Sequence, residues 1–311
     1  MDPLIDAILE ETAPRLQNLP EDCCRLLHGR GHTDDRFRPI AVDWFAPVLL
    51  ITCYGGMEDE RLADLARRLH EQAGPGVGCI LLQNRGTTDA PVRLLAGSLP
   101  EVCEAKEDGM HFLLNFTRNR NHGFFPDMIH GRRWIRQEAD GCRILNLFAY
   151  TCSLSVAALA GGAAEVVNID MSRGSIATGQ RNHVRNRHLW AEGGRARFLS
   201  HNLFRSWGRL QRQGPFDLVV IDPPTMQGRS FHLERDYPLV VRRLAGLTRP
   251  GSRVLAAVNS PFLPVGYLES LFAEESPGFR PVQRMAAGAG FEERKAPGQA
   301  GLRMVVFQRE G

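Results

Sequence analysis

Residues 219–228 read VVIDPPTMQG, an apolar run of strand-forming residues that stops abruptly at an acid and two prolines. Proline cannot donate a hydrogen bond to a sheet ladder, and it biases the residue before it towards an extended backbone. The strand must therefore end at Asp222. The sequence predicts that a carboxylate and its neighbouring backbone carbonyls are held rigidly at the rim of a sheet.

Strands and helices alternate along the chain on both sides of this segment. The predicted strands are residues 143–149, 165–169, 196–199, 216–221 and 252–258, and the predicted helices are residues 153–161, 173–187 and 235–248. This alternation predicts right-handed crossovers and a mostly parallel, doubly wound α/β sheet of the Rossmann-like class. The closing stretch GLRMVVFQRE predicts a final antiparallel strand at an edge of that sheet.

A smaller α/β domain is predicted ahead of the sheet. The expected division is a helical extension over 1–35, made of two short helices, a small α/β domain over 36–117, and the doubly wound domain over 118–311. Within the small domain, AVDWFAPVLLITCYGG predicts a strand pair or a bent strand, and MEDERLADLARRLHEQAG predicts an amphipathic helix that ends at Gly74. GCILLQNRG predicts the next strand, and PVRLLAG and GMHFLLNFT fit a hairpin or edge strands.

Composition indicates a soluble chain that stays in the cytoplasm. The N-terminus MDPLIDAILEETAPRL carries acids where an export signal needs a basic start, and no apolar run approaches the length of a membrane span. The seven cysteines are odd in number and contain no C-x-x-C pair, so neither disulfides nor a metal site is expected. The net charge is +3, and nearly all of the cations are Arg, which suits phosphate contacts or reflects genome composition.

Ligands of doubly wound sheets lie beyond the carboxyl ends of the strands, so the residues there are the candidate site. The first such loop, NLFAYTCSLS, has no G-x-G-x-x-G and therefore predicts a cofactor without a pyrophosphate. Asp170 follows the second strand, where an acid accepts ribose hydroxyls; the alternative is that it caps the helix near Ser172. Asn202 is a candidate for adenine recognition or a loop residue bonded to its own backbone.

The acceptors at Asp222 suit an amino or imino group of a planar base that has left its stack. The alternative is a proline-rich turn without chemistry. On this reasoning Asn259 would lie across the pocket from Asp222, and Thr225 or Phe231 would lie along the face of the base.

Three stretches resemble a known family in their order and spacing. They are ILNLFAYTCSLSVAALAGGAAEVVNIDMSRGSIATGQRN, then FDLVVIDPPTM, then RVLAAVNS. Together they resemble the class I S-adenosylmethionine-dependent methyltransferases, and more narrowly the bacterial 23S ribosomal RNA methyltransferases that modify guanine N7 or cytosine C5. EDGMHFLLNFTRNRNHGFFPDMIHGRRWI and RLLHGRGHTDDRFRPIAVDWF extend the likeness over about residues 25–311.

The resemblance implies roles for individual residues and makes 118–311 an S-adenosylmethionine-binding domain. The implied cofactor contacts are Phe148, Tyr150, Thr151 and Ser153 around the methionine part, Asp170 and Met171 at the ribose and adenine, and Gly123, Phe125 and Asp127 upstream. The implied reaction site is Asp222, Pro223 and Pro224. The chain departs from the family at Cys152, where Gly is usual, at Asn202, where an acid is usual, and at Met128 and Ile129, where a polar residue and an Arg are usual.

Cytosine C5 normally requires activation by a cysteine thiolate, and every cysteine of this chain lies at or before position 152. This favours direct in-line transfer to a base nitrogen, with guanine preferred, and no metal is needed. Contact with RNA is expected from the small domain and from a basic set that would otherwise be a solvated surface: Arg118, Arg120, Arg132, Arg133 and Arg136.

Three functions are compatible with these patterns. The first is a methyltransferase that acts on RNA, with ribosomal RNA as its partner. The second is a methyltransferase for a protein amide or a small molecule, which the same Asp-Pro-Pro geometry would serve. The third is a non-catalytic RNA-binding or assembly factor on a degenerate methyltransferase fold, which the departures at Cys152, Asn202 and Ile129 motivate.

Overall fold

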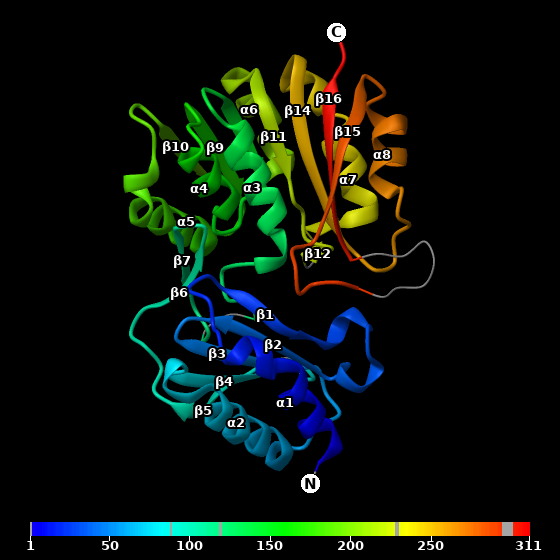
Figure 1. The fold of residues 1–311 in the computed structure, drawn as a ribbon. Helices are drawn as coiled ribbons and strands as arrows, with labels where there is room; N and C mark the ends of the chain where they lie inside the picture. Colours follow the sequence, from blue (N-terminus) through cyan, green and yellow to red (C-terminus); the bar gives the residue numbers. More distant parts are fainter. Residues whose placement is uncertain (1, 88, 118–119, 228–229, 294–300) are drawn as a thin grey trace. The chain divides into compact units, whose positions relative to one another are not determined.

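The computed structural model describes residues 2–87, 89–117, 120–227, 230–293 and 301–311. The chain divides into two compact units (Figure 1). The first consists of Met1–Pro126 and Gly288–Lys295, and the second of Asp127–Ala287 and Ala296–Gly311. The chain therefore passes from the first unit to the second, returns once, and enters the second unit again. In the described part of the chain, no helix combines the length and the apolar character needed to cross a membrane.

The first unit contains a five-stranded sheet in the order β1-β2-β3-β4-β5. The strands are β1 Cys24–His28, β2 Ile40–Phe45, β3 Val48–Cys53, β4 Cys79–Asn84 and β5 Val92–Gly97. β3 and β4 are parallel neighbours, and helix α2, Asp59–Ala73, lies between them in the sequence. The other neighbouring strands pair antiparallel. Helix α1, Pro3–Leu16, contributes Ile5 and Ile8 to the same apolar core as the sheet. A separate hairpin joins β6, Cys103–Glu107, to β7, Met110–Leu114.

Two predictions for this unit are wrong in detail. The second predicted helix of residues 1–35 is instead strand β1, whose Cys24 lies opposite Trp44 of β2. A short apolar segment such as CRLLH fits either structure by periodicity, and its pairing with β2 settles it as a strand. PVRLLAG and GMHFLLNFT do not form a hairpin with each other, because β5 pairs with β4 and β7 pairs with β6. β5 is an edge strand, as the other reading proposed.

The second unit is built on a seven-stranded sheet in the order β10-β9-β8-β11-β14-β16-β15. The strands are β8 Arg143–Leu147, β9 Glu165–Asp170, β10 Arg195–Ser200, β11 Phe216–Ile221, β14 Thr248–Asn259, β15 Phe279–Ala286 and β16 Leu302–Arg309. All pairs from β10 to β14 are parallel, whereas β16 is antiparallel to both of its neighbours. The predicted doubly wound α/β class is confirmed. The order reverses between β8 and β11, where this class of sheet places its ligands.

Helices cover both faces of this sheet. They are α3 Ile129–Glu138, α4 Ser153–Ala160, α5 Arg173–Arg185, α6 Trp207–Gln213, α7 Leu233–Val241 and α8 Tyr267–Glu275. α6, α7 and α8 share one apolar cluster with strand residues such as Ile221, whereas α3 and α4 share another with Val220. Because successive side chains of a strand point to opposite faces, these two clusters lie on opposite sides of the sheet.

The C-terminal third differs most from the prediction. Helix α7 ends at Val241, and β14 already begins at Thr248, so the predicted helix over 235–248 is too long. β16 is antiparallel as predicted, but it lies inside the sheet, because β15 pairs along its outer side. The sequence analysis did not predict β15, because FRPVQRMA is largely exposed and contains a proline. Both features are typical of an edge strand.

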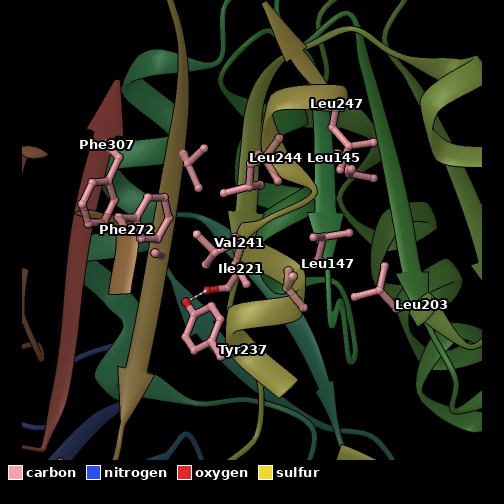
Figure 2. Close-up of a cluster of buried hydrophobic side chains, with 14 of the residues drawn as sticks. Leu145, Leu147, Leu203, Ile221, Tyr237, Val241, Leu244, Leu247, Phe272 and Phe307 are labelled. Atoms are coloured by element: carbon pink, nitrogen blue, oxygen red, sulfur yellow. Dashed lines mark hydrogen bonds between the residues drawn. The ribbon is translucent and has the colours of Figure 1, made fainter. Parts of the chain in front are cut away.

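Tyr237 links helix α7 to the carboxyl ends of two strands (Figure 2). Its ring is fully buried, and its hydroxyl donates to the carbonyl of Ala257 at 3.0 Å and lies 3.4 Å from that of Ile221. Ile221 directly precedes Asp222. The helix therefore supports the backbone from which the Asp222 side chain projects.

Removing the Tyr237 hydroxyl should destabilise the second unit. We expect Tyr237→Phe to cost about 1–2 kcal/mol, because the carbonyl of Ala257 loses its buried donor, and Tyr237→Ala to cost about 3–5 kcal/mol through the cavity that it opens. Urea unfolding monitored by circular dichroism measures both. A Tyr237→Phe variant as stable as the wild type would show that the hydroxyl contributes nothing.

Candidate functional site

The loop after β8 carries an unusual backbone. Phe148, Tyr150 and Cys152 have φ angles of 56°, 46° and 64°, the left-handed conformation that non-glycine residues rarely adopt. Such conformations cost energy and persist only where the surroundings enforce them. Here the Tyr150 N–H donates to the carboxylate of Asp170 at 2.9 Å, and the Ala149 N–H donates to the Ile169 carbonyl at 3.0 Å. The end of β9 therefore holds the loop in place.

Asp170 connects the two loops that follow β8 and β9. One carboxylate oxygen accepts the Tyr150 N–H, and the other accepts the Ser172 N–H at 2.8 Å. The cap of helix α5 is Ser172 itself, whose hydroxyl accepts the Ser175 N–H at 3.2 Å. Burial raises the pKa of the Asp170 carboxyl, and its two backbone hydrogen bonds oppose that shift. Each carboxylate oxygen can accept a further hydrogen bond, so Asp170 retains capacity for a ligand.

A pocket opens beside Asp170, with about 350 Å³ of space that is partly open to solvent. It is lined by Phe148, Ile169, Asp170, Met171, His201, Asn202, Leu203, Phe204, Gln227, Ser230 and Phe231. The Phe231 ring packs against Phe148 at 5.0 Å and against Phe204 at 6.4 Å between ring centroids. An aromatic wall, a carboxylate and an amide in one pocket suit a planar base attached to a sugar.

Asp222 lies immediately after β11, next to β8 in the sheet. Loss of water around its carboxyl raises the pKa to about 7, the nearby charge of Asp127 adds to the rise, and Arg132 opposes it. Asn259 contacts residues near Asp222. Its side-chain amide lies 3.5 Å from the Asp127 carboxylate, and its backbone carbonyl accepts the Thr225 hydroxyl at 3.0 Å. A carboxyl whose pKa is near neutrality, at a strand end, is typical of a reaction site.

A family model described as S-adenosylmethionine-dependent methyltransferase matches residues 24–308, most of the 311-residue chain. The chain belongs to this family. The predicted family and cofactor, S-adenosylmethionine, are thereby confirmed.

Two curated relatives act on ribosomal RNA according to their names. Ribosomal RNA large subunit methyltransferase K/L of Hahella chejuensis is 27% identical over 233 residues, which are 71% of this chain and 32% of the relative. Ribosomal RNA large subunit methyltransferase I of Yersinia pseudotuberculosis is 27% identical over 186 residues, which are 58% of this chain and 46% of the relative. The chain thus spans less than half the length of each.

Solved structures share the fold. A Streptococcus mutans protein described as a SAM-dependent methyltransferase superposes with a TM-score of 0.84 at 18% identity, over 99% of this chain and 82% of the other. At this identity the likeness concerns the fold, and it agrees with the doubly wound sheet described above.

The residues that line the pocket beside Asp170 offer groups of the kind that the adenosine part of the methyltransferase cofactor would contact. Phe148, Met171 and Phe231 offer apolar surface for a base, and Asp170 offers oxygen acceptors for ribose hydroxyls. Asn202 lines the same pocket. Its side-chain oxygen accepts the Phe204 N–H at 2.9 Å, which is the local backbone bond given as the alternative in the sequence analysis. Contact between Asn202 and adenine therefore stays a prediction.

The remaining predicted cofactor residues lie in two places. Tyr150, Thr151 and Ser153 belong to the strained loop and to the start of α4, and Thr151 is buried. Asp127 belongs to the second unit with Asp222, whereas Phe125 belongs to the first unit, where its ring is exposed. Gly123 of the first unit has a φ of 110°, which explains the need for glycine there.

Three proposed substrate contacts need correction or fall outside the description. Phe231 is buried and faces the pocket beside Asp170, so it does not lie along the face of a base held at Asp222. Arg132 is completely buried in α3 and does not belong to a basic surface. Its charge acts on Asp222 instead. Arg118 lies outside the described residues, while Arg120 and Arg133 are exposed.

Sequence reasoning missed a buried polar network beneath the strained loop. Asn146 donates to Asn168 at 2.9 Å, Asn168 donates to the Ser155 hydroxyl at 3.0 Å, and that hydroxyl lies 2.8 Å from His183 Nε2. Burial lowers the pKa of His183 to about 4, so the ring is neutral at physiological pH. The other ring nitrogen then donates to the carbonyl of Gly179 at 2.7 Å. The network fixes the part of α5 that contacts the loop.

Gly179 makes room for Cys152, one of the positions at which the resemblance predicted a different residue. A Cβ at position 179 would lie 2.5 Å from the Cys152 sulfur, which is closer than real side chains approach. The Cys152 side chain is completely buried, and burial raises the pKa of its thiol. The cysteine thus acts as a packing group that Gly179 accommodates.

This close contact predicts a pair of compensating substitutions. Gly179→Ala should displace the loop and raise the Kd for S-adenosylmethionine roughly tenfold, because the packed core cannot absorb the added methyl group. Cys152→Gly removes the opposing sulfur, so the double variant should return to within roughly twofold of the wild type. Calorimetry measures the four Kd values. Additive effects in the double variant would contradict the proposed contact.

The raised pKa of Asp222 predicts that stability falls as pH increases. The folded carboxyl titrates near pH 7 and the unfolded one near its model value of 3.8, so the folded state loses stability between these values. Asp222→Asn carries no such penalty. Without cofactor, its stability relative to the wild type should therefore rise by roughly 1–3 kcal/mol between pH 4 and pH 8. Denaturant unfolding at several pH values tests this, and a constant difference would mean that Asp222 titrates normally.

Proposed function

We propose that this protein transfers a methyl group from S-adenosylmethionine to a base nitrogen of ribosomal RNA, with guanine favoured. The observation that supports this best is the position of Asp222. Its carboxyl has a pKa of about 7 and follows β11, at the point where the strand order reverses. The names of the two ribosomal RNA methyltransferases reported above support the choice of RNA.

The residues on the β8 side would hold the cofactor. We assign Asp170 to the ribose hydroxyls, Met171 and Asn202 to the adenine, and the loop with Tyr150 and Thr151 to the methionine part. When bound, S-adenosylmethionine supplies an electrophilic methyl group on its sulfonium sulfur. The protein contributes mainly by positioning, because in-line displacement depends on alignment of the two reacting groups.

The residues on the β11 side would hold the acceptor base. Pro223 and Pro224 restrict the backbone after Asp222, so its carboxylate is held in one direction. When ionised, Asp222 accepts a hydrogen bond from an amino or imino group, and a pKa of about 7 also suits it to take a proton from an exocyclic nitrogen. The Asn259 side chain is exposed at the end of β14 and would contact the same base.

The cysteines support transfer without a covalent enzyme intermediate. Cys152 follows β8 but is fully buried with a raised thiol pKa, so it is a poor nucleophile. Cys142 precedes β8, at the opposite end of that strand from Asp222. The other five belong to the first unit. A base nitrogen needs no such nucleophile, whereas cytosine C5 normally does.

RNA contact would come from exposed cations. Arg133 of α3 and Arg120 of the first unit are exposed, and Arg136 is partly exposed. Such groups bind phosphates without reading sequence. We also assign RNA contact to the small domain over 36–117.

Transfer of labelled methyl groups tests the proposal. Purified protein is incubated with labelled S-adenosylmethionine and either total RNA or ribosomal particles from a strain that lacks the gene. Asp222→Ala should lower the rate by about 100-fold with little change in cofactor Kd, because it acts on the acceptor. Asp170→Ala should raise the cofactor Kd at least about tenfold. Glu192→Gln is the matched control, because this exposed acid lies in the turn before the amino end of β10.

The outcomes separate the three candidate functions. Label in an N-methylated guanine supports the proposal, and label at cytosine C5 contradicts direct transfer to nitrogen. Label only in protein or small molecules, with a rate insensitive to salt and ribonuclease, supports the second function. Absence of cofactor binding supports a non-catalytic factor.

A further inference from the structure

Large apolar side chains are exposed directly beyond the two proposed acceptor-side residues. Met226 follows Asp222 in strand β12, Met226–Gln227, and 67% of its surface is exposed. Phe262 and Val265 follow Asn259, and they are 84% and 54% exposed. Isolated exposed apolar residues are ordinary, but several beside one candidate site indicate a surface that binds something.

The segment that carries Phe262 is firmly held. The Arg303 guanidinium of β16 donates to the carbonyls of Ser260 at 3.3 Å, Leu263 at 3.2 Å, and Pro264. Leu263 is buried in the core, and the Phe262 N–H donates to the Ser260 hydroxyl at 3.4 Å. Phe262 therefore projects from an anchored turn, with buried neighbours at positions 260 and 263.

The turns after β11 and β14 lie at the same edge of the sheet. The two strands pair in parallel, and the Thr225 hydroxyl donates to the Asn259 carbonyl at 3.0 Å. Thr225 directly precedes Met226, and Asn259 is three positions before Phe262. Met226 and Phe262 therefore follow the two residues that we assign to the acceptor base.

The chemistry of this edge suits a base rather than a phosphate. Residues 254–268 contain no charged side chain, and Asp222 is the only charged residue in 219–228. The nearby guanidinium of Arg303 donates to carbonyls of the turn itself. Phosphate recognition needs cations or converging N–H donors, whereas a base stacks on an aromatic ring through its flat face. A base removed from its stack also leaves its neighbours partly unstacked, and they need replacement surfaces.

We propose that Phe262 stacks on an unpaired RNA base that flanks the target nucleotide, with Met226 supplying apolar contact on the other acceptor-side turn. The inference rests on the proposed RNA substrate and adds a contact that selects single-stranded or distorted RNA. Phe262 acts on substrate binding and leaves the cofactor site unchanged.

Substitutions at Phe262 separate stacking from general apolar contact. Phe262→Ala should raise the KM for ribosomal RNA roughly tenfold, because stacking on an aromatic side chain supplies that much binding. Phe262→Trp should preserve KM, and Phe262→Leu should resemble Phe262→Ala despite its apolar side chain. The Kd for S-adenosylmethionine and the thermal midpoint should stay at wild-type values in all three. Val184→Ala is the matched control, because Val184 is 77% exposed near the far end of α5.

A binding measurement distinguishes failure of this inference from failure of the proposed function. The probe is an RNA fragment with 2-aminopurine next to the methylated nucleotide, or at successive positions of an unpaired ribosomal RNA loop. Fluorescence should change on binding the wild type and Phe262→Trp, but not Phe262→Ala. Normal KM and fluorescence in Phe262→Ala, with active wild type, overturn the stacking role alone. A wild type that neither binds nor methylates RNA overturns both, and protein methylation lost in Phe262→Ala identifies the surface as a protein-docking site.

Discussion

The hydrogen bonds of Asp170 hold the cofactor side of this fold together. One carboxylate receives the backbone N–H groups of Tyr150 and Ser172, so the loop after β8 and the start of α5 share a single anchor. The loop that this carboxylate anchors contains three left-handed residues. The same carboxylate lines the pocket to which we assign the adenosine, so the group proposed to bind the ribose also anchors the loop proposed to hold the methionine part.

Packing beneath that anchor accommodates a departure from the family pattern. At a position where the resemblance predicted glycine, Cys152 adopts a left-handed backbone and fills a space left by Gly179. Gly179 in turn accepts a hydrogen bond from His183, whose neutral ring terminates a chain of buried amides and a hydroxyl. The substitution at position 152 therefore has a matched site in α5, which favours a maintained cofactor loop over a degenerate one.

The sequence predicted the parts of the fold that depend on local chemistry. Strands β9 and β11 and the proline stop at Asp222 follow from residue type and spacing, and the structure has them where they were expected. The sequence analysis did not predict β15 or the Asn146–His183 network. Polar residues without a regular spacing of apolar neighbours are interpreted as surface residues when their partners in the folded structure are unknown. Arg132 and Phe231 were misassigned for the same reason, since burial depends on contacts distant in sequence.

The order of strands in the second unit has a consequence for synthesis on the ribosome. β15 is bonded to β16 rather than to β14, so β15 can join the sheet only after residues 302–309 have been made. The first unit is also incomplete until residues 288–293 have been made. Each unit therefore needs residues from beyond position 287 to finish folding, and a nascent chain arrested before residue 302 would expose an unpaired β14 edge.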